Sequence, residues 1–126
     1  MMLEPTMTAA EAVCAVRDRW PTARTDGEIL ALLGTCENTV RTAVCGMEGA
    51  AVLEADTLLT VPAPYEGLYI HYAAAHLAQL EGETERYNEE LALFYGVWND
   101  FTGAFRRENL PTDRCAAGFA NRGVKK

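Results

Sequence analysis

Two histidines and a dense run of glutamates are the residues of this chain whose types and spacing could do chemistry. His71 and His76 are five residues apart, so on one helix their side chains point about 140° away from each other. A single helix therefore cannot present both imidazoles to one metal ion, whose ligands must converge. We expect two separate histidines that pack or face solvent, and no metal site.

The glutamates gather around Gly82. Paired carboxylates can transfer protons when one of them is desolvated. The neighbouring sequence supplies no apolar residues to desolvate them, so we expect a solvated face. An enzyme that uses His71 or these glutamates is one alternative, and it requires a pocket that holds a titrating group of perturbed pKa. The glutamates are Glu81, Glu83, Glu85, Glu89 and Glu90.

The common catalytic and cofactor-binding motifs are absent from the sequence. It has no phosphate-binding loop, no dinucleotide fingerprint, no H-E-x-x-H and no G-x-S-x-G. Its four cysteines, Cys14, Cys36, Cys45 and Cys115, include no C-x-x-C pair. Cys14 and Cys36 fall inside expected helices, where a free cysteine behaves as a small buried hydrophobe. We expect no catalytic residue and no cofactor.

The strongest helical pattern lies between residues 87 and 105. Apolar residues there are spaced 4, 3, 4, 3 and 4 apart, which predicts one apolar stripe on a helix that ends at Pro111. We interpret this stripe as the core contact of two antiparallel helices. Its members are Tyr87, Leu91, Phe94, Trp98, Phe101 and Phe105, and the opposite face carries Glu85, Arg86, Glu89, Glu90, Asn99, Asp100 and Arg107.

A preceding helix is expected from about Pro64 or Tyr65 to Leu80, because proline is tolerated at a first helical position and Gly82 is a natural stop. Tyr65, Tyr69 and Tyr72 recur on it at four-three spacing. These rings could form an exposed surface for protein contacts or face the following helix. We favour the core, where each hydroxyl still needs a partner.

Two further helices precede this hairpin. Thr8-x-x-Glu11 fits a capping box, and it predicts a helix from about Ala9 to Arg19 with Val13, Val16 and Trp20 on one face. Thr25 and Asp26 open the next helix, which we expect to run to about Cys45 and to end at Gly46. Its apolar positions are Ile29, Leu32, Leu33, Cys36, Val40, Ala43 and Val44.

The expected fold is therefore all-α: one small bundle of about four helices in two hairpins, residues 1–111. Residues 47–61 have weak periodicity and form a loop or a small β-arm between the second and third helices. Residues 112–126 have no clear period and are expected to form a flexible, basic C-terminal tail.

The charge of the chain is negative and uneven. The formal net charge is −7, whereas residues 111–126 carry four basic residues against Asp113, so the preceding 110 residues carry −10. A dedicated nucleic-acid binder usually presents a basic face, which argues against that class. No secretory signal or membrane-spanning run is visible, and a reducing cytoplasm is the default expectation. The residues alone indicate an acidic helical domain that binds protein rather than catalyses a reaction.

Several short motifs resemble a family of small phage proteins. They are Pro21-Thr22-x-x-Thr25-Asp26, then Pro62-x-Pro64-Tyr65-x-x-Leu68-Tyr69, then Arg86-Tyr87-Asn88-Glu89, and finally Phe101 to Pro111 with Arg106, Arg107 and Asn109. Over most of residues 7–111 the chain is similar to head-tail connector, or adaptor, proteins of tailed bacteriophages and of prophages in Gram-positive bacteria. It departs from that pattern at His71, at Ala73-Ala74-Ala75 and at His76, where bulkier residues are expected, and in its longer tail.

The resemblance implies a structural virion protein of the neck, made in the host cytoplasm. Such connectors form a ring, typically of about twelve copies, beneath the portal protein. The ring extends the DNA channel and joins the capsid to the next neck or tail protein. DNA passes through without specific binding, because an acidic body repels phosphates. No membrane, cofactor or catalysis is implied.

On this hypothesis, two segments carry the protein contacts. The loop, with Glu54, Asp56 and Leu58, reaches a neighbouring subunit or lines the channel, and the basic tail docks on the portal through Arg114, Arg122, Lys125 and Lys126. Two alternatives remain open: another neck or tail-completion protein, and a cytoplasmic helical protein-interaction or regulatory module.

Overall fold

Four α-helices make up the fold in the computed structural model, which describes residues 5–48 and 53–109. Helix α1 is Ala9–Arg19 and α2 is Asp26–Thr39, continued by the π-helical turn η1, Val40–Val44. Helix α3 is Gly67–Leu80 and α4 is Thr84–Asn109. The described residues contain no strand, so the expected all-α bundle is confirmed, and no β-arm forms in the described part of residues 47–61.

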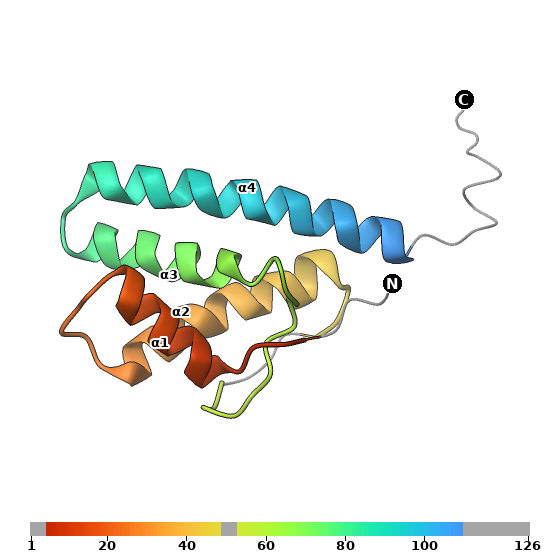
Figure 1. The fold of residues 1–126 in the computed structure, drawn as a ribbon, viewed down its shortest axis with the longest axis horizontal. Coiled ribbons are helices and arrows are strands. Elements are labelled where there is room, and N and C mark those ends of the chain that lie inside the picture. Colours follow the sequence, from red (N-terminus) through yellow and green to blue (C-terminus); the bar gives the residue numbers. More distant parts are fainter. Residues whose placement is uncertain (1–4, 49–52, 110–126) are drawn as a thin grey trace.

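The helices lie in three layers with α3 in the middle (Figure 1). Helix α4 packs antiparallel to α3 on one side, and both α1 and α2 contact α3 from the other side. Because α3 is covered on two sides, its Ala73-Ala74-Ala75 run is fully buried. Small side chains there allow neighbouring helices to approach closely, since side-chain size sets the distance between helix axes.

Local signals set most of the helix ends as expected. Thr8 and Thr25 each form a capping box with the glutamate three residues later, and such a cap stabilises a helix by about 1 kcal/mol. Gly46 and Gly82 have φ values of 66° and 78°, the left-handed conformation that favours glycine after a helix. Helix α3 begins at Gly67 rather than at Pro64 or Tyr65, because residues 62–66 form turns.

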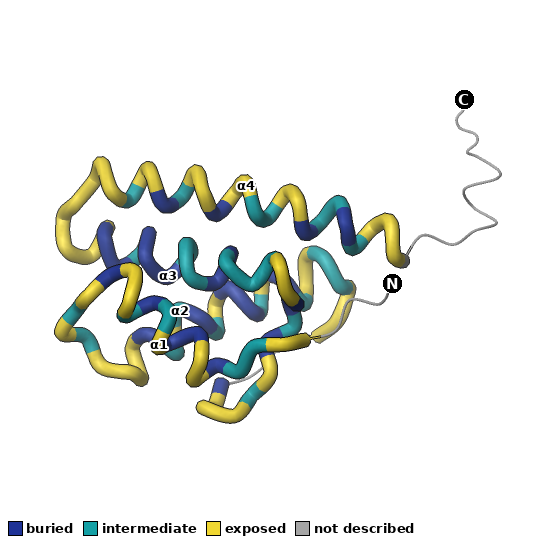
Figure 2. Tube along the Cα trace, in the orientation of Figure 1, coloured by how far each residue is buried: buried dark blue, intermediate teal, exposed yellow. Residues whose placement is uncertain are grey.

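The apolar stripe of α4 packs inward, so its interpretation as core is confirmed. Phe94 and Phe101 are buried, and the other four stripe residues are partly buried against the core. Tyr72 on α3 contacts Phe94, with ring centroids 5.6 Å apart, and Tyr65 contacts Phe101 at 6.0 Å. Figure 2 shows that the buried positions of α4 recur on the side of the helix that faces α3.

The described part of the loop between η1 and α3 packs against the bundle. Leu53, Leu59 and Val61 are buried, and residues 55–59 are bonded to the start of α1. The Ala9 and Ala10 amides, which have no partner inside their own helix, donate to the carbonyls of Thr57 at 2.8 Å and Ala55 at 2.9 Å. The loop therefore completes the cap of α1 and shares its core.

Of the two cysteines expected to be buried inside helices, only one is buried. Cys36 is fully buried, but Cys14 is exposed because it lies on the solvent side of α1. Being inside a helix does not decide burial, since only one face of α1 packs against its neighbours.

Candidate protein-interaction surface

Of the three loop residues expected to contact partners, Glu54 and Asp56 lie on one turn and Leu58 directly follows it. Glu54, Asp56 and Leu58 are all exposed, and the Leu58 side chain is 55% exposed. The turn is closed by hydrogen bonds from the Thr57 amide to the Glu54 carbonyl and from the Glu54 amide to the Thr57 hydroxyl, both 3.0 Å. These three side chains are thus presented on a rigid base. The four basic residues expected in the tail lie outside the described residues.

A buried carboxylate behind this turn was missed by the sequence analysis. Glu37 is 2% exposed and sits on the apolar face of α2 between Leu33 and Val40. A glutamate inside an apolar stripe was the available signal, because a carboxylate is almost never buried without partners.

Glu37 accepts hydrogen bonds from two other parts of the chain. The Thr60 hydroxyl donates at 2.6 Å and the Thr60 amide at 3.1 Å, while the Tyr69 hydroxyl donates at 2.5 Å. The Tyr69 oxygen in turn accepts from the Val61 amide at 3.0 Å. Burial, followed by the nearby Glu37 charge, raises the pKa of Tyr69 far above its ordinary value, and burial does the same for Cys36. The cluster fastens the loop to α2 and α3, and all of its hydrogen bonds are made within the chain.

A second buried carboxylate corrects the expected solvated face of α4. Glu90 is 3% exposed and accepts from Arg19 Nε at 2.9 Å, and its other oxygen lies 2.9 Å from His71 Nδ1. One side chain therefore joins α1, α3 and α4. His76 instead pairs its Nδ1 with the Tyr72 carbonyl at 3.0 Å, so the two histidines are separate, as expected.

The other four glutamates of the run, Glu81, Glu83, Glu85 and Glu89, are exposed as expected. Glu81 accepts hydrogen bonds from the Trp20 indole at 3.0 Å and the Thr22 hydroxyl at 3.1 Å. The Arg86 guanidinium lies over the Trp20 ring, 4.5 Å from its centroid. These contacts hold the end of α1 against the junction of α3 and α4.

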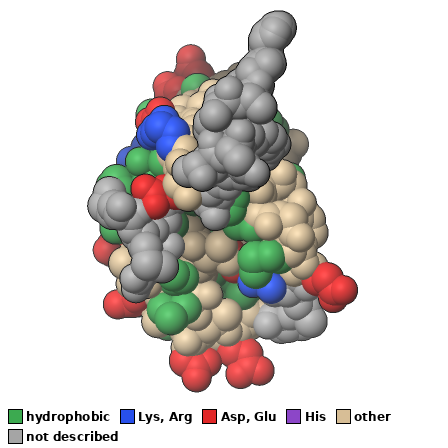
Figure 3. Space-filling model, turned by 90° about the vertical axis from the view of Figure 1, so that its right-hand side faces the viewer, with side chains coloured by type: hydrophobic (Ala, Val, Ile, Leu, Met, Phe, Trp, Pro, Cys, Tyr) green, Lys and Arg blue, Asp and Glu red, His purple; other side chains and the backbone are tan. Residues whose placement is uncertain are grey.

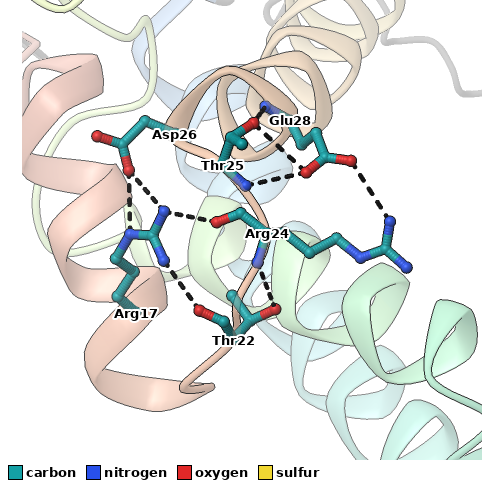
Figure 4. Close-up of polar contacts among 6 residues, drawn as sticks. All are labelled: Arg17, Thr22, Arg24, Thr25, Asp26 and Glu28. Carbon is teal, nitrogen blue, oxygen red and sulfur yellow. Dashed lines mark hydrogen bonds and ion pairs between the residues drawn. The ribbon is translucent and has the colours of Figure 1, made fainter.

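The connection between α1 and α2 is fastened by Arg17 (Figure 4). Its guanidinium donates to Asp26 Oδ1 at 2.6 and 3.0 Å and to the carbonyls of Thr22 and Arg24 at 3.1 and 2.7 Å. This arginine satisfies carbonyls that no helix pairs, so the short connection is held in one geometry.

An apolar groove runs along the outer face of α2 and has a volume of about 370 Å³. Small side chains form much of its floor, and Leu53 from the loop forms one edge. We call it the α2 groove; it is lined by residues that include Gly27, Leu30, Ala31, Gly34, Asn38 and Leu53.

A second hollow of about 340 Å³ is lined by α4 residues, by Pro5, and by residues of the loop that follows η1. It shares no residue with the α2 groove. Seen from the end of the bundle where α4 finishes, hydrophobic side chains reach the surface, and acidic ones surround them (Figure 3). We call this second hollow the end hollow; its lining includes Pro5, Cys45, Met47, Pro62, Phe101 and Phe105.

Comparison with known proteins found no matching family model, curated protein or solved structure. Within residues 5–48 and 53–109, no three or more metal-ligating side chains come together. No helix in the same described ranges is long and apolar enough to cross a membrane.

Proposed function

We propose that this chain is a head-tail connector of a tailed bacteriophage, a structural protein of the virion neck. Copies form a ring under the portal protein, extend the DNA channel and join the capsid to the next neck or tail component. The role is non-catalytic. The protein is made in the host cytoplasm and acts in the assembled particle.

The observation that carries the proposal is the pair of apolar surfaces, the α2 groove and the end hollow, which share no residue. A ring requires heterologous contacts, in which one face of a subunit binds a different face of its neighbour. Two separate apolar surfaces on a rigid bundle meet that requirement. The buried carboxylates Glu37 and Glu90 are engaged by protein groups, which supports a structural rather than a catalytic use.

The charge of the chain suits a DNA channel. A net charge of −7 repels phosphates and so favours passage of DNA over binding. Glu54 and Asp56 are exposed on the loop turn, where they can line a channel or face a neighbouring subunit.

The test is the mass of the complex formed with the purified portal ring of the same phage, read by native mass spectrometry. A defined number of copies on each portal supports the proposal. Leu58→Glu on the loop turn should reduce the number bound, whereas the matched control Leu93→Glu on α4 should not. Leu58 and Leu93 are 55% and 45% exposed, so neither change disturbs the core.

Absence of portal binding by the unmodified chain would overturn the connector proposal. The α2 groove then favours the alternative of a helical interaction module, because such modules receive an amphipathic helix in an apolar groove. Binding to a different virion component would instead indicate another neck or tail-completion protein.

A further inference from the structure

We propose that the α2 groove receives the C-terminal segment, residues 110–126, of a neighbouring copy. This inference rests on the proposed function only in treating the linked copies as a ring. The contact itself is a property of this chain and can be tested without a portal.

The floor of the groove is suited to an approaching chain. Gly27, Ala31 and Gly34 follow one another along α2 at spacings of four and three, and all three line the groove. Such spacing places them on one face of the helix. Leu30 and Leu53 supply apolar walls, and Leu53 is held in place by its burial in the core.

Asn38 lines the groove and has an unsatisfied polar atom. Its side-chain oxygen Oδ1 is buried and has no hydrogen-bond partner among the described residues. Leaving a buried acceptor unpaired is unfavourable. Because this oxygen is closed to solvent, an N–H group of an occupant can pair with it only when the Asn38 side chain turns toward the groove.

The charges around the groove select a basic occupant. Glu54 and Asp56 are exposed beside Leu53, and residues 53–85 contain no lysine or arginine. Asp26 and Glu28 at the start of α2 are already paired with Arg17 and Arg24, so the free negative charge beside the groove comes from the loop. The segment 110–126 carries four basic residues against one acidic residue. Opposite charges on the two surfaces favour their encounter and fix its orientation.

The sequence of the segment fits the same surface. Phe119 is its one aromatic residue, and it is flanked by Gly118 and Ala120. One large ring between small residues can enter a groove with a glycine and alanine floor. Asn121 and the backbone amides supply donors for Asn38 Oδ1.

The segment starts at one end of the bundle and is long enough to reach a neighbouring copy. Helix α4 finishes at the end of the bundle opposite to the start of α2 (Figure 1). The segment can extend up to about 55 Å, at roughly 3.3 Å per residue. A segment that leaves one end of a subunit and binds the outer face of the next makes a heterologous contact. Repeating this contact gives a ring when the rotation between copies closes, and an open filament otherwise.

Cysteine cross-linking of the full chain tests the contact, because Cys115 lies inside the segment. The exposed Cys14 and the partly buried Cys45 are first replaced by Cys14→Ser and Cys45→Ala. Ala31→Cys then places a thiol in the groove, and Ala92→Cys places one on the exposed face of α4 as the control. Copies of two different masses are mixed and treated with a short bismaleimide.

We expect cross-links between copies in the Ala31→Cys protein, roughly tenfold more than in the control, since docking raises the effective concentration of the two thiols. Added salt should lower the yield, because it screens the charges. Equal yields in both variants, no cross-link, or cross-links within single copies would each overturn the inference.

A second variant removes the contact without relying on new thiols. Ala31→Lys adds bulk and positive charge to the groove, while Ala92→Lys makes the same change outside it. We expect only Ala31→Lys to abolish the association of copies measured by sedimentation, with the helical circular dichroism of both proteins unchanged. Association that survives in Ala31→Lys contradicts the inference.

Binding to the portal is the measurement that separates the two proposals. Copies that cross-link through the groove but fail to bind a portal would support the groove contact and overturn the connector function. Copies that form a ring on the portal but give no groove cross-links would support the connector function and overturn the groove contact. Cross-linking of Cys115 to the portal would show that the segment docks there and would overturn the inference.

Discussion

The Tyr69 hydroxyl donates a 2.5 Å hydrogen bond to the buried Glu37 carboxylate, so a residue of α3 satisfies a charge on α2. The same hydroxyl oxygen accepts from the Val61 amide. One phenol therefore connects two helices and the loop that bears the exposed turn. Four predictions follow from this and other contacts.

Tyr69→Phe should destabilise the fold by about 1–3 kcal/mol, because it leaves the Val61 amide without its partner and Glu37 with one donor fewer. Urea unfolding measures the change. Tyr95→Phe is the matched control, since Tyr95 is 54% exposed and its hydroxyl can be replaced by water contacts. Equal effects of the two substitutions would contradict the role given to Tyr69.

Alkaline pH should weaken the fold through the same residue. The pKa of Tyr69 is raised in the folded state, mainly by burial and then by the Glu37 charge, so the folded chain keeps this proton while the unfolded chain releases it near the ordinary tyrosine pKa of about 10. The folded state therefore binds more protons above that pH. Its free energy of unfolding falls as pH rises.

Unfolding free energies measured from pH 8 to 11 check this direction. The buried Cys36, whose pKa is also raised by burial, adds to the fall in the same sense. Tyr69→Phe should make the pH dependence shallower, whereas Tyr95→Phe should not. A pH dependence unaffected by Tyr69→Phe would refute the assignment.

Glu90→Ala should cost about 1–3 kcal/mol, because it removes the carboxylate that joins Arg19 and His71 across three helices. Arg19 is 41% exposed and regains water contacts, which keeps the loss below that of a fully buried pair. Glu89→Ala, at an exposed position next to it, should change stability little. Thermal or urea unfolding of the two variants distinguishes them.

The same glycine-to-alanine change should have opposite signs at two positions. Gly82→Ala should destabilise by about 1 kcal/mol, since Gly82 has a φ of 78° that alanine rarely adopts. Gly96 lies inside α4 with no atom within 4 Å of an added Cβ. Gly96→Ala should therefore stabilise by up to about 1 kcal/mol. If urea unfolding shows that both substitutions change the free energy of unfolding in the same direction, the backbone conformation of the glycine does not decide the effect.

The helices could be predicted from the sequence because their signals are local. The capping boxes at Thr8 and Thr25, the stop at Gly82 and the stripe from Tyr87 to Phe105 each depend on residues within a few turns of one another. Periodicity also identified which face of α4 is buried. These features need no knowledge of how the helices pack.

The candidate surface was predictable only in part. Glu54, Asp56 and Leu58 are exposed, and their role as contact residues stays a prediction, whereas the α2 groove was not anticipated. Its floor consists of small residues of α2, but its wall is Leu53, which arrives from the loop. A groove made by two segments has no signature in either segment alone.

The sequence by itself determined the number and the apolar faces of the helices and most of their ends, because hydrogen bonds and side-chain spacing within a helix act over a few residues. The tertiary structure decided which charges are buried. Glu37 and Glu90 lie in the interior because Tyr69, Thr60, Arg19 and His71 bring hydrogen-bonding groups to them from distant parts of the chain. A carboxylate can leave water only when such partners converge on it, and that convergence exists only in the packed bundle.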